Sequence, residues 1–412
     1  MSPDLNAVDY DPFNPANTQN PYPLYKRMRE EAPVWRGGMY DDVFLSRHAD
    51  ITAVLRDAER FSSDSSNLAP EVRAQNPSAE DADQNMMAGF LGGKIMLFSD
   101  PPDHTRLRRL ASHAFTPRSI EKWRPRIRGL VEEMLSEVGP GDEFDVMATL
   151  ARPLPVVVIA ELLGVPLADQ EKFAGWAVPL ARMIDPDSNM GPDDYSAAIS
   201  AAMEFVGYFN ALIEERRGAP SDDVLSTLIA AEEEGDRLTH EELLINLILL
   251  LIAGHETTSN LIGNGALALC EHPTARDEFA ANPDELARTA VDEFLRYDAP
   301  VQFTVRTALT DVEFDNETVR KGHQVLLLLA GANRDPDAFE RPDDVVLDRT
   351  PNNHLAFSNG IHFCLGAMLA RMEGQEAFPA LIKKFPKLER RSELLYRPNM
   401  TLRGLAELHV TG

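Results

Sequence analysis

The stretch LTHEELLINLILLLIAGHETTSNLIGNGALALCEHP, residues 238–273, decides the fold class. Thr239 and Glu242 fit a capping box at its start, and Pro273 marks its end. We therefore predict a single helix of about 30 residues, which would be roughly 45 Å long at 1.5 Å per residue. A helix of that length would cross the whole protein.

The apolar character of this stretch indicates where the helix lies. Its apolar run, 243–253, contains Asn246 and is shorter than the roughly 18 residues that a membrane span requires. A helix that is apolar on most sides and too short to span a membrane is typical of a protein core. We expect it to be the central helix of a soluble protein.

The segments around this helix are mostly helical. From Asp103 to about Ala281 the pattern indicates helices, with breaks at Pro117, 139–141, 164–166 and 185–194. Before it, APVWRGGMYDDVFLSRHADITAVLRD predicts a hairpin turning at Gly37 and Gly38 and a helix starting near His48.

The polar segment 62–84 reads as a loop. Strand-like runs occur late in the chain, at FTVRTAL from Phe303, at QVLLLLA from Gln324, and in short alternating pieces between Lys387 and Val410. We find no internal repeat and no linker of the Gly/Ser or Pro-rich type. The sequence predicts one domain, 1–412, mainly α with a small β region.

Composition excludes several functional classes. The 412 residues are 44% hydrophobic, which is enough for a large core. The formal net charge of -26 would repel phosphate backbones and anionic lipid heads, so we expect no nucleic acid and no membrane surface as partners. Two cysteines make no disulfide framework, and MSPDLNAVDYDPF contains no secretory h-region, so we expect a cytoplasmic protein.

One segment runs against this acidic balance. Between His104 and Arg128 a single acid, Glu121, faces eight cations, namely Arg106, Arg108, Arg109, Arg118, Lys122, Arg124, Arg126 and Arg128. Such a basic segment can be an ordinary solvated face, or it can steer an acidic partner. The charge pattern alone leaves both open.

Within the long helix, AGHETT breaks the apolar pattern. Gly254 costs about 1 kcal/mol relative to alanine in a helix interior, and an unpaired buried Glu256 would cost more. One interpretation is a kinked core helix whose Thr257 bonds back to a carbonyl and whose Glu256 pairs elsewhere. The other is a groove in which a ligand lies against the helix and receives protons from Glu256 and Thr257.

Three other features are weak when taken singly. Cys364 in FSNGIHFCLG (357–366) could be a small buried hydrophobe. EFLR places Glu293 and Arg296 at the spacing of an ordinary ion pair on a helix surface. Arg306 in a predicted strand, and His104 with Arg108 at i, i+4, would each pass as surface residues.

The three motifs together are specific. FSNGIHFCLG fits F-x-x-G-x-H-x-C-x-G, AGHETT fits [AG]-G-x-[DE]-T, and EFLR fits E-x-x-R, with AGHETT first, EFLR second and FSNGIHFCLG last along the chain. The sequence therefore resembles the cytochrome P450 family of haem-thiolate monooxygenases. The resemblance covers nearly the whole chain, from NPYPLYKRMREEAPV to TLRGLAEL.

The resemblance implies a cytochrome P450 fold, with the long helix over a haem b, and it assigns residues to the haem. Cys364 would be the proximal iron ligand, whose thiolate favours O–O cleavage. Phe357 would pack near the sulfur, and Gly360 and Gly366 would allow tight turns beside the porphyrin. The propionate partners would be His104, Arg108, Arg306 and His362.

The other motifs also receive roles from the resemblance. Glu256 and Thr257 would deliver protons during oxygen activation. Glu293 and Arg296 would form a structural ion pair, which we expect Arg334 or Arg341 in NRDPDAFERP (333–342) to complete.

Electrons must come from another protein, because the chain has no flavin or iron–sulfur domain. We expect a ferredoxin and an NAD(P)H-ferredoxin reductase. The helix beginning near His104 would face this partner. Some of Arg106, Arg109, Lys122 and Arg126 would steer it, and Arg108 would point inward.

The substrate is predicted only by class, as an apolar molecule such as a fatty acid, terpenoid, steroid or macrolide. The expected pocket walls are Leu249, Ile252, Ala253, Met86, Met87, Phe90, Met183, Ile184, Val301 and Phe303. We expect a monomer. The alternatives are a peroxide-driven peroxygenase on the same fold, a haem-binding carrier or sensor without turnover, and a chain without haem whose Cys364 is merely buried.

Overall fold

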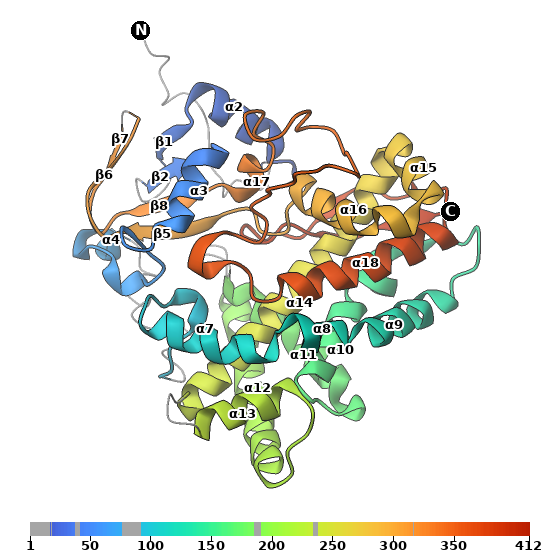
Figure 1. Ribbon diagram of the computed structural model, residues 1–412, viewed down its shortest axis with the longest axis horizontal. Helices are drawn as coiled ribbons and strands as arrows, with labels where there is room; N and C mark the ends of the chain where they lie inside the picture. The colour runs from blue at the N-terminus through green and yellow to red at the C-terminus, as the bar shows by residue number, and fades with distance from the viewer. Residues whose placement is uncertain are drawn as a thin grey trace.

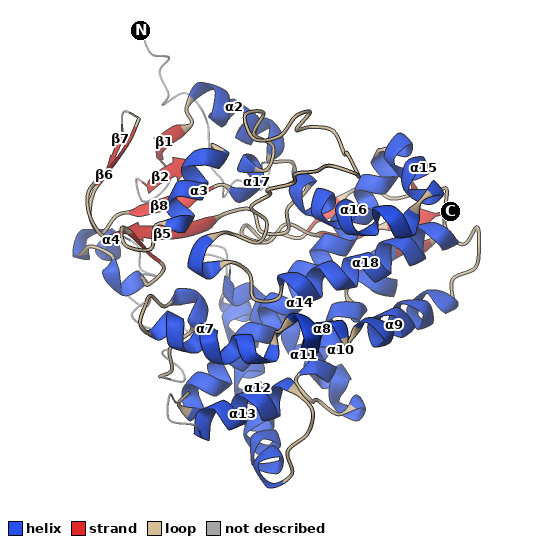
Figure 2. Ribbon diagram, in the orientation of Figure 1, coloured by secondary structure: helices blue, strands red, loops and turns tan. Residues whose placement is uncertain are grey.

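Helices fill most of the molecule, and short strands gather along one side and near the C-terminus (Figures 1 and 2). The computed structural model describes residues 17, 19–37, 42–75, 92–184, 191–233, 238–315 and 317–412. The prediction of a mainly α protein with a small β region is confirmed.

The helices are α2 (Tyr22–Glu31), α3 (His48–Arg56), α4 (Pro70–Gln75), α7 (Asp103–Ala114), α8 (Pro117–Glu121), α9 (Arg124–Ser136), α10 (Pro153–Leu162), α11 (Gln170–Ala181), α12 (Pro192–Gly218), α13 (Val224–Glu233), α14 (His240–Glu271), α15 (Pro273–Ala281), α16 (Pro283–Tyr297), α17 (Leu329–Ala332) and α18 (Ala367–Lys384). The strands are β1 (Val34–Gly37), β2 (Asp42–Leu45), β3 (Phe61–Ser62), β4 (Phe144–Asp145), β5 (Thr304–Ala308), β6 (Val312–Phe314), β7 (Glu317–Val319), β8 (Gln324–Leu327), β9 (Glu389–Arg390), β10 (Leu395–Tyr396), β11 (Leu405–Glu407) and β12 (His409–Thr411).

Helix α14 is the predicted central helix and runs behind α18 in Figure 1. The Thr239 hydroxyl accepts from the backbone N–H of Glu242 at 3.1 Å, and the Glu242 carboxylate accepts from the N–H of Thr239 at 3.0 Å. This capping box satisfies two backbone donors that the first turn leaves without intrahelical partners. The helix has 32 residues and ends one residue before His272, and Pro273 then begins α15.

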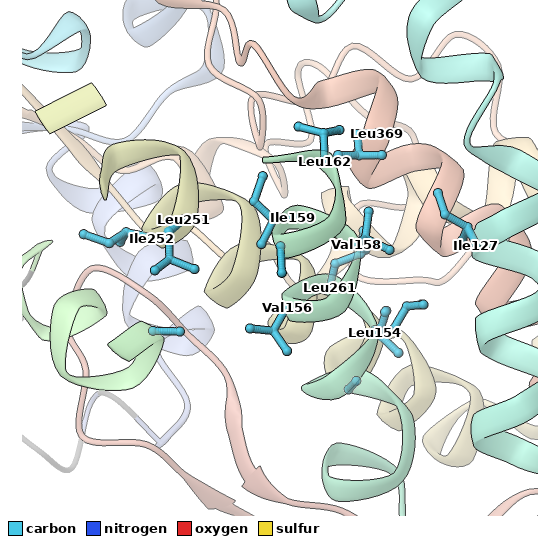
Figure 3. Packing of buried hydrophobic residues seen from close by; sticks show 14 of the residues in the cluster. Ile127, Leu154, Val156, Val158, Ile159, Leu162, Leu251, Ile252, Leu261 and Leu369 are labelled. Carbon is cyan, nitrogen blue, oxygen red and sulfur yellow. The ribbon is translucent and has the colours of Figure 1, made fainter. Parts of the chain in front are cut away.

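Helix α10 fills the space beside α14. Its apolar side chains Val158, Ile159 and Leu162 are at most 2% exposed. Figure 3 shows them between α14 on one side and Ile127 of α9 and Leu369 of α18 on the other. Because each fully buried aliphatic side chain contributes roughly 1.5–3 kcal/mol, this packing holds the middle of α14 in place.

The main sheet has the strand order β1-β2-β8-β5-β3. Strands β1 and β2 pair antiparallel, which confirms the predicted hairpin, although its turn lies outside the described residues. Strand β8 pairs parallel with β2 and antiparallel with β5, which sets Arg306 opposite Val325. The pairing of β5 with β8 thus fixes the position of Arg306 in the sheet, beside the helices.

Two sequence-based boundaries were wrong. The segment 62–84, predicted as a loop, contains α4, whose Val72 is buried against Leu68. The run from Gln324 was predicted as one strand, but β8 ends at Leu327 and α17 follows.

Length and composition alone would let two helices, α12 and α14, cross a membrane. Of the most apolar 18-residue window, 72% is buried inside the protein in α14 and 39% in α12. Such helices are weak evidence for a span, because a core helix of a soluble protein passes the same test. Burial, rather than the shortness of its apolar run, therefore marks α14 as a core helix.

Candidate active site

Cys364 lies in the turn between a short 3₁₀ segment, Gly360–His362, and the start of α18. Its backbone N–H donates to the carbonyl oxygen of Phe357 at 2.9 Å, which closes the loop. Burial raises the pKa of the Cys364 thiol, whereas hydrogen bonds from the backbone N–H groups of Gly366 and Ala367 act to lower it. These two amides stand at the N-terminus of α18, where the helix dipole also favours negative charge. The turn therefore places hydrogen-bond donors around the sulfur.

The two glycines of this loop differ in what they require. Gly360 has φ +68°, and a Cβ there would overlap the carbonyl oxygen of Leu55 in α3, so only glycine fits. Gly366 has φ -85°, and a Cβ would meet no described protein atom within 4 Å. The backbone does turn at Gly366, as predicted, but its conformation suits any residue, so the turn itself does not require glycine there.

The predicted propionate partners come from three segments. His104 and Arg108 lie one turn apart on α7, Arg306 lies on β5, and His362 precedes the cysteine. The rings of His104 and His362 are 4.2 Å apart between centroids, and the Nε2 atom of each is buried without a hydrogen-bond partner. Burial lowers the pKa of both imidazoles, that of His362 to about 3.

Arg306 is 8% exposed and donates to the Val305 carbonyl at 2.7 Å and to the Thr304 hydroxyl at 3.3 Å. Burial lowers its pKa to about 10, and the opposing attraction of Asp100 is smaller. Within the part of the chain that the structure describes, neither Arg306 nor Arg108 makes a salt bridge with a carboxylate. The predicted propionate partners thus form a cluster of side chains whose hydrogen-bonding capacity is not fully used within the described residues.

The AGHETT segment of α14 has features of both interpretations, the helix that bonds back to itself and the groove for a ligand. The Thr257 hydroxyl donates to the carbonyl of Ala253 at 2.6 Å, as in a helix that bonds back to itself. Yet Thr257 is partly exposed and Ala253 is exposed, in the middle of an otherwise buried helix. A Cβ at Gly254 would meet no atom closer than 3.4 Å, so packing does not demand glycine there.

Glu256 is 1% exposed and forms a salt bridge with Arg397, with 2.5 Å between Nη1 and Oε1. Its other oxygen, Oε2, is buried without a hydrogen-bond partner. Arg397 follows β10, so the C-terminal hairpin holds the acid of the central helix. The neighbouring His255 is also buried, and burial lowers its pKa to about 4.

The predicted pocket walls divide into three groups. Ala253 presents surface, Leu249 is 6% exposed, and Val301 and Met183 are partly buried. Ile252 has no accessible surface, so the structure places it in the core, and the prediction of a wall residue was wrong at this position. Phe303 packs in a cluster with Tyr25, Met28 and Phe44 and is 7% exposed, as little as Leu249, so its role in the pocket wall stays a prediction. Met86, Met87 and Phe90 lie outside the described residues, as does the side chain of Ile184.

Glu293 and Arg296 form a fully buried ion pair on α16, with Nη2–Oε1 and Nε–Oε2 distances of 2.8 Å. The prediction that Arg334 or Arg341 completes it was wrong. Arg349 donates to Glu293 Oε2 at 2.9 Å instead.

The contacts of Arg334 and Arg341 explain why neither completes the Glu293–Arg296 pair. Arg334 bonds the carbonyl of Tyr297 and lies over the Tyr22 and Tyr297 rings, and Arg341 is exposed near Asp344. Of these three arginines, Arg349 is the one whose side chain reaches the Glu293 carboxylate.

The basic segment is largely neutralised by acids distant in sequence. Arg106 binds Glu242 through two hydrogen bonds of 2.8 and 2.7 Å, and Arg126 binds Glu161 through two of 2.9 and 2.6 Å. Arg124 and Arg128 share Glu376. Arg106 and Arg126, expected to steer a partner, are therefore engaged within the protein. Arg109 and Lys122 are exposed.

Comparisons with known proteins agree on one family. The cytochrome P450 family model matches residues 24–395. The chain belongs to the cytochrome P450 family. It is 40% identical to the vitamin D(3) 25-hydroxylase of Pseudonocardia autotrophica, covering 98% of this chain and 96% of that one. It is 41% identical to the cytochrome P450 monooxygenase PikC of Streptomyces venezuelae, with 99% and 93% covered.

A solved structure gives the same result. The cytochrome P450 PksS of the Bacillus subtilis 168 bacillaene polyketide synthase superposes with a TM-score of 0.87 at 37% identity, covering 98% of this chain and 99% of that one. The predicted cytochrome P450 fold is thus confirmed. The protein is a cytochrome P450 monooxygenase, an oxidoreductase of a family that uses haem b.

The described residues fit this cofactor. Haem b carries one iron and two propionate carboxylates, and the structure offers one sulfur surrounded by amide donors and a cluster of cationic or hydrogen-donating side chains without carboxylate partners. The open space at Gly366 would accommodate a flat group lying against the backbone. Cys364 would hold the iron, and His104, Arg108, Arg306 and His362 would hold the propionates.

Sequence reasoning missed three arginines of this region, Arg349, Arg371 and Arg397. Arg371 donates to Asp292 at 2.7 Å, and its guanidinium lies 4.6 Å over the Phe357 ring. The sequence carries no signal for them. Each partner lies between 56 and 141 residues away along the chain, and a lone arginine in a loop or on a helix face has no local pattern.

Proposed function

We propose that this monooxygenase inserts one oxygen atom of O2 into an apolar small molecule, with electrons from a ferredoxin and an NAD(P)H-ferredoxin reductase. Thiolate-ligated haem, when bound, supplies the reductive cleavage of O2. The observation that carries the proposal is the pairing on α14 of a partly exposed hydroxyl, Thr257, with a buried carboxylate, Glu256. Gas binding or storage alone would not need an acid and an alcohol there.

The two side chains have complementary tasks. Thr257 donates its proton to the Ala253 carbonyl, so its oxygen is left to accept a hydrogen bond from a group on the open side of the helix. Glu256 keeps one oxygen on Arg397 and has a second oxygen without a partner, which can take up a proton and pass it on. We assign proton delivery to this pair.

The substitution Thr257→Ala tests this assignment. We expect continued NAD(P)H oxidation with hydrogen peroxide replacing most of the product, because oxygen activation loses its hydroxyl while electron delivery stays intact. Product and peroxide per NAD(P)H measure the coupling. Ser259→Ala is the matched control, since Ser259 donates to the His255 carbonyl at 2.9 Å in the same way but is fully buried. Tightly coupled turnover in Thr257→Ala would remove Thr257 from the mechanism.

The electron source distinguishes this proposal from a peroxygenase. The two cysteines of the chain cannot hold an iron–sulfur cluster once one of them binds haem, so the reductant must be external. Turnover with a ferredoxin, its reductase and NADPH should exceed turnover with hydrogen peroxide alone. Peroxide-driven turnover as fast as that of the reductase system would favour the peroxygenase.

The substrate class follows from the character of the site and from a relative. The vitamin D(3) 25-hydroxylase is named for an apolar substrate, and Ala253 presents a methyl group beside Thr257. We propose a fatty acid, terpenoid, steroid or macrolide for this chain. Candidate ligands can be screened by the Soret shift that accompanies loss of water from the ferric iron, and only apolar compounds should produce it.

We further propose that the protein is a cytoplasmic monomer, without nucleic acid or membrane partners. Its acidic composition supports this, because a net charge of -26 keeps copies apart and opposes anionic surfaces. Sedimentation at micromolar concentration should give the mass of one chain, about 45.7 kDa without cofactor.

A further inference from the structure

Two side chains, Arg371 and His354, lie against the ring of Phe357, and both bind a third, Asp292. Asp292 lies on α16, His354 lies in the loop before Phe357, and Arg371 lies on α18. The guanidinium of Arg371 stands 4.6 Å from the ring centroid, and the His354 ring stands 5.6 Å from it. Both side chains bind the same atom, Asp292 Oδ1, at 2.7 Å from Arg371 and 3.2 Å from His354.

The hydrogen bonds define the charge of each member. His354 Nδ1 accepts from the backbone N–H of Ala356 at 3.2 Å, so the proton of the neutral ring is on Nε2, which donates to Asp292. Burial lowers the pKa of His354 and keeps the ring neutral. Burial opposes ionisation of Asp292, but the His354 hydrogen bond and the charge of Arg371 lower its pKa overall. The cluster is therefore a carboxylate and a guanidinium with a neutral histidine.

Phe357 connects this cluster to the cysteine. Its carbonyl accepts the Cys364 N–H at 2.9 Å, and its side chain is the ring that Arg371 covers. Arg371 is thus linked to Cys364 through Phe357, whose ring it covers and whose carbonyl binds the cysteine amide.

We propose that the Asp292–Arg371 pair is a positioning device for the known reaction, one that fixes Phe357 behind Cys364 and sets the reduction potential of the bound haem. Arg371 is a positioning residue and touches neither substrate nor iron ligand. The inference rests on Cys364 being the iron ligand.

The two members of the pair predict opposite effects. Reduction of the iron adds an electron beside the sulfur, and a nearby positive charge favours the more negative state. Arg371→Gln removes that charge and leaves Asp292 uncompensated, so the potential should become more negative. Asp292→Asn removes the negative partner, so the potential should become more positive. Arg371→Lys keeps the charge and should stay close to the unmodified protein.

The chain offers a matched control on the same two helices. Lys383 of α18 donates to Asp284 of α16 at 2.6 and 2.8 Å, so it forms an ion pair between the same two helices, at a more exposed position. It lies twelve residues beyond Arg371, about 18 Å along the helix, so its charge is much farther from the start of α18. Lys383→Gln and Asp284→Asn should leave the potential unchanged.

The experiment is a redox titration of the haem-loaded protein, combined with the spectrum of the ferrous carbon monoxide complex, which reports thiolate ligation. Opposite shifts in Arg371→Gln and Asp292→Asn, with thiolate ligation retained, support the proposal. Shifts in the same direction, no shift in either variant, or loss of the thiolate spectrum in all three variants would overturn it. An unmodified protein that lacks the thiolate spectrum would instead refute Cys364 as the ligand.

Discussion

At the scale of single residues, the cysteine loop uses two glycines for different purposes. Gly360 has a positive φ and lies against the Leu55 carbonyl, so the protein's own backbone requires glycine at this position. Gly366 adopts a conformation that any residue tolerates, and no described atom lies within 4 Å of where its Cβ would be. We therefore propose that the cofactor accounts for glycine at that position.

This difference predicts two distinct phenotypes. Gly360→Ala should destabilise the folded protein by about 2 kcal/mol or more, since a left-handed conformation costs an L-residue roughly 1–2 kcal/mol and the methyl group also overlaps Leu55. Gly366→Ala should leave the denaturant midpoint of the haem-free chain unchanged and lower the haem retained per protein. Equal loss of stability in both variants would contradict the distinction.

Residues found by motif and residues found only in the structure differ in a physical respect. Cys364, Glu256 and Glu293 stand in short patterns whose spacing is local, so the sequence identified them. Arg349 and Arg397 reach their carboxylates from segments brought close only by folding. A guanidinium on a long flexible stem can pair with any acid within its reach, and so its partner cannot be read from spacing.

At the scale of elements, α14 was predicted well because its signals reinforce one another. A capping box, an apolar run and a terminal proline all indicate one helix. The run from Gln324 lacked such signals, and an apolar run of a few residues fits a strand or a buried helix equally. Its last residues form α17, in which Leu329 and Ala332 pack against α3 and Ala330 packs against α2, rather than continuing the sheet.

The buried histidine of α14 predicts how stability depends on pH. Burial lowers the pKa of His255 from 6.5 to about 4, so the folded protein binds fewer protons than the unfolded chain between these values. The neutral His255 ring therefore contributes fully to the free energy of unfolding above about pH 6.5. This contribution, about 3 kcal/mol, is lost as the pH falls toward 4.

Urea unfolding at several pH values between 4 and 7 measures this slope. His255→Gln should flatten it relative to the unmodified protein, whatever its effect on stability at pH 7. The exposed His113 gives the control His113→Gln, which should keep the original slope. An unchanged slope in His255→Gln would show that protonation of His255 does not cause the loss of stability at acidic pH.

At the scale of the whole molecule, the net charge and the charges near a contact surface have different effects on an acidic partner. The net charge of -26 would repel an acidic ferredoxin as a whole. Such long-range repulsion is screened beyond about 8 Å at physiological ionic strength, so the cations near the contact decide the final approach. Most cations of the basic segment are already paired, Arg106 with Glu242 and Arg126 with Glu161. Steering must therefore depend on a smaller set than the sequence indicated.

Arg109 on α7 and Lys122 directly after α8 are exposed, and α7, α8 and α9 follow one another across the molecule in Figure 1. Lys122 has only a long contact of 3.7 Å with the exposed Asp222, and an exposed pair of this kind is worth little. We propose that these two positions face an acidic partner, because both side chains are exposed.

Charge reversal at these two positions, Arg109→Glu and Lys122→Glu, should slow reduction by a ferredoxin at low salt by about tenfold, since steered association depends on local complementarity. The difference from the unmodified protein should shrink as salt is added, because screening removes the steering term. Stopped-flow reduction at several ionic strengths measures both effects. Lys321→Glu, an exposed cation next to the β6–β7 hairpin, is the control and should leave the rate unchanged. Equal rates for all variants at low salt would mean that the electron donor approaches another surface.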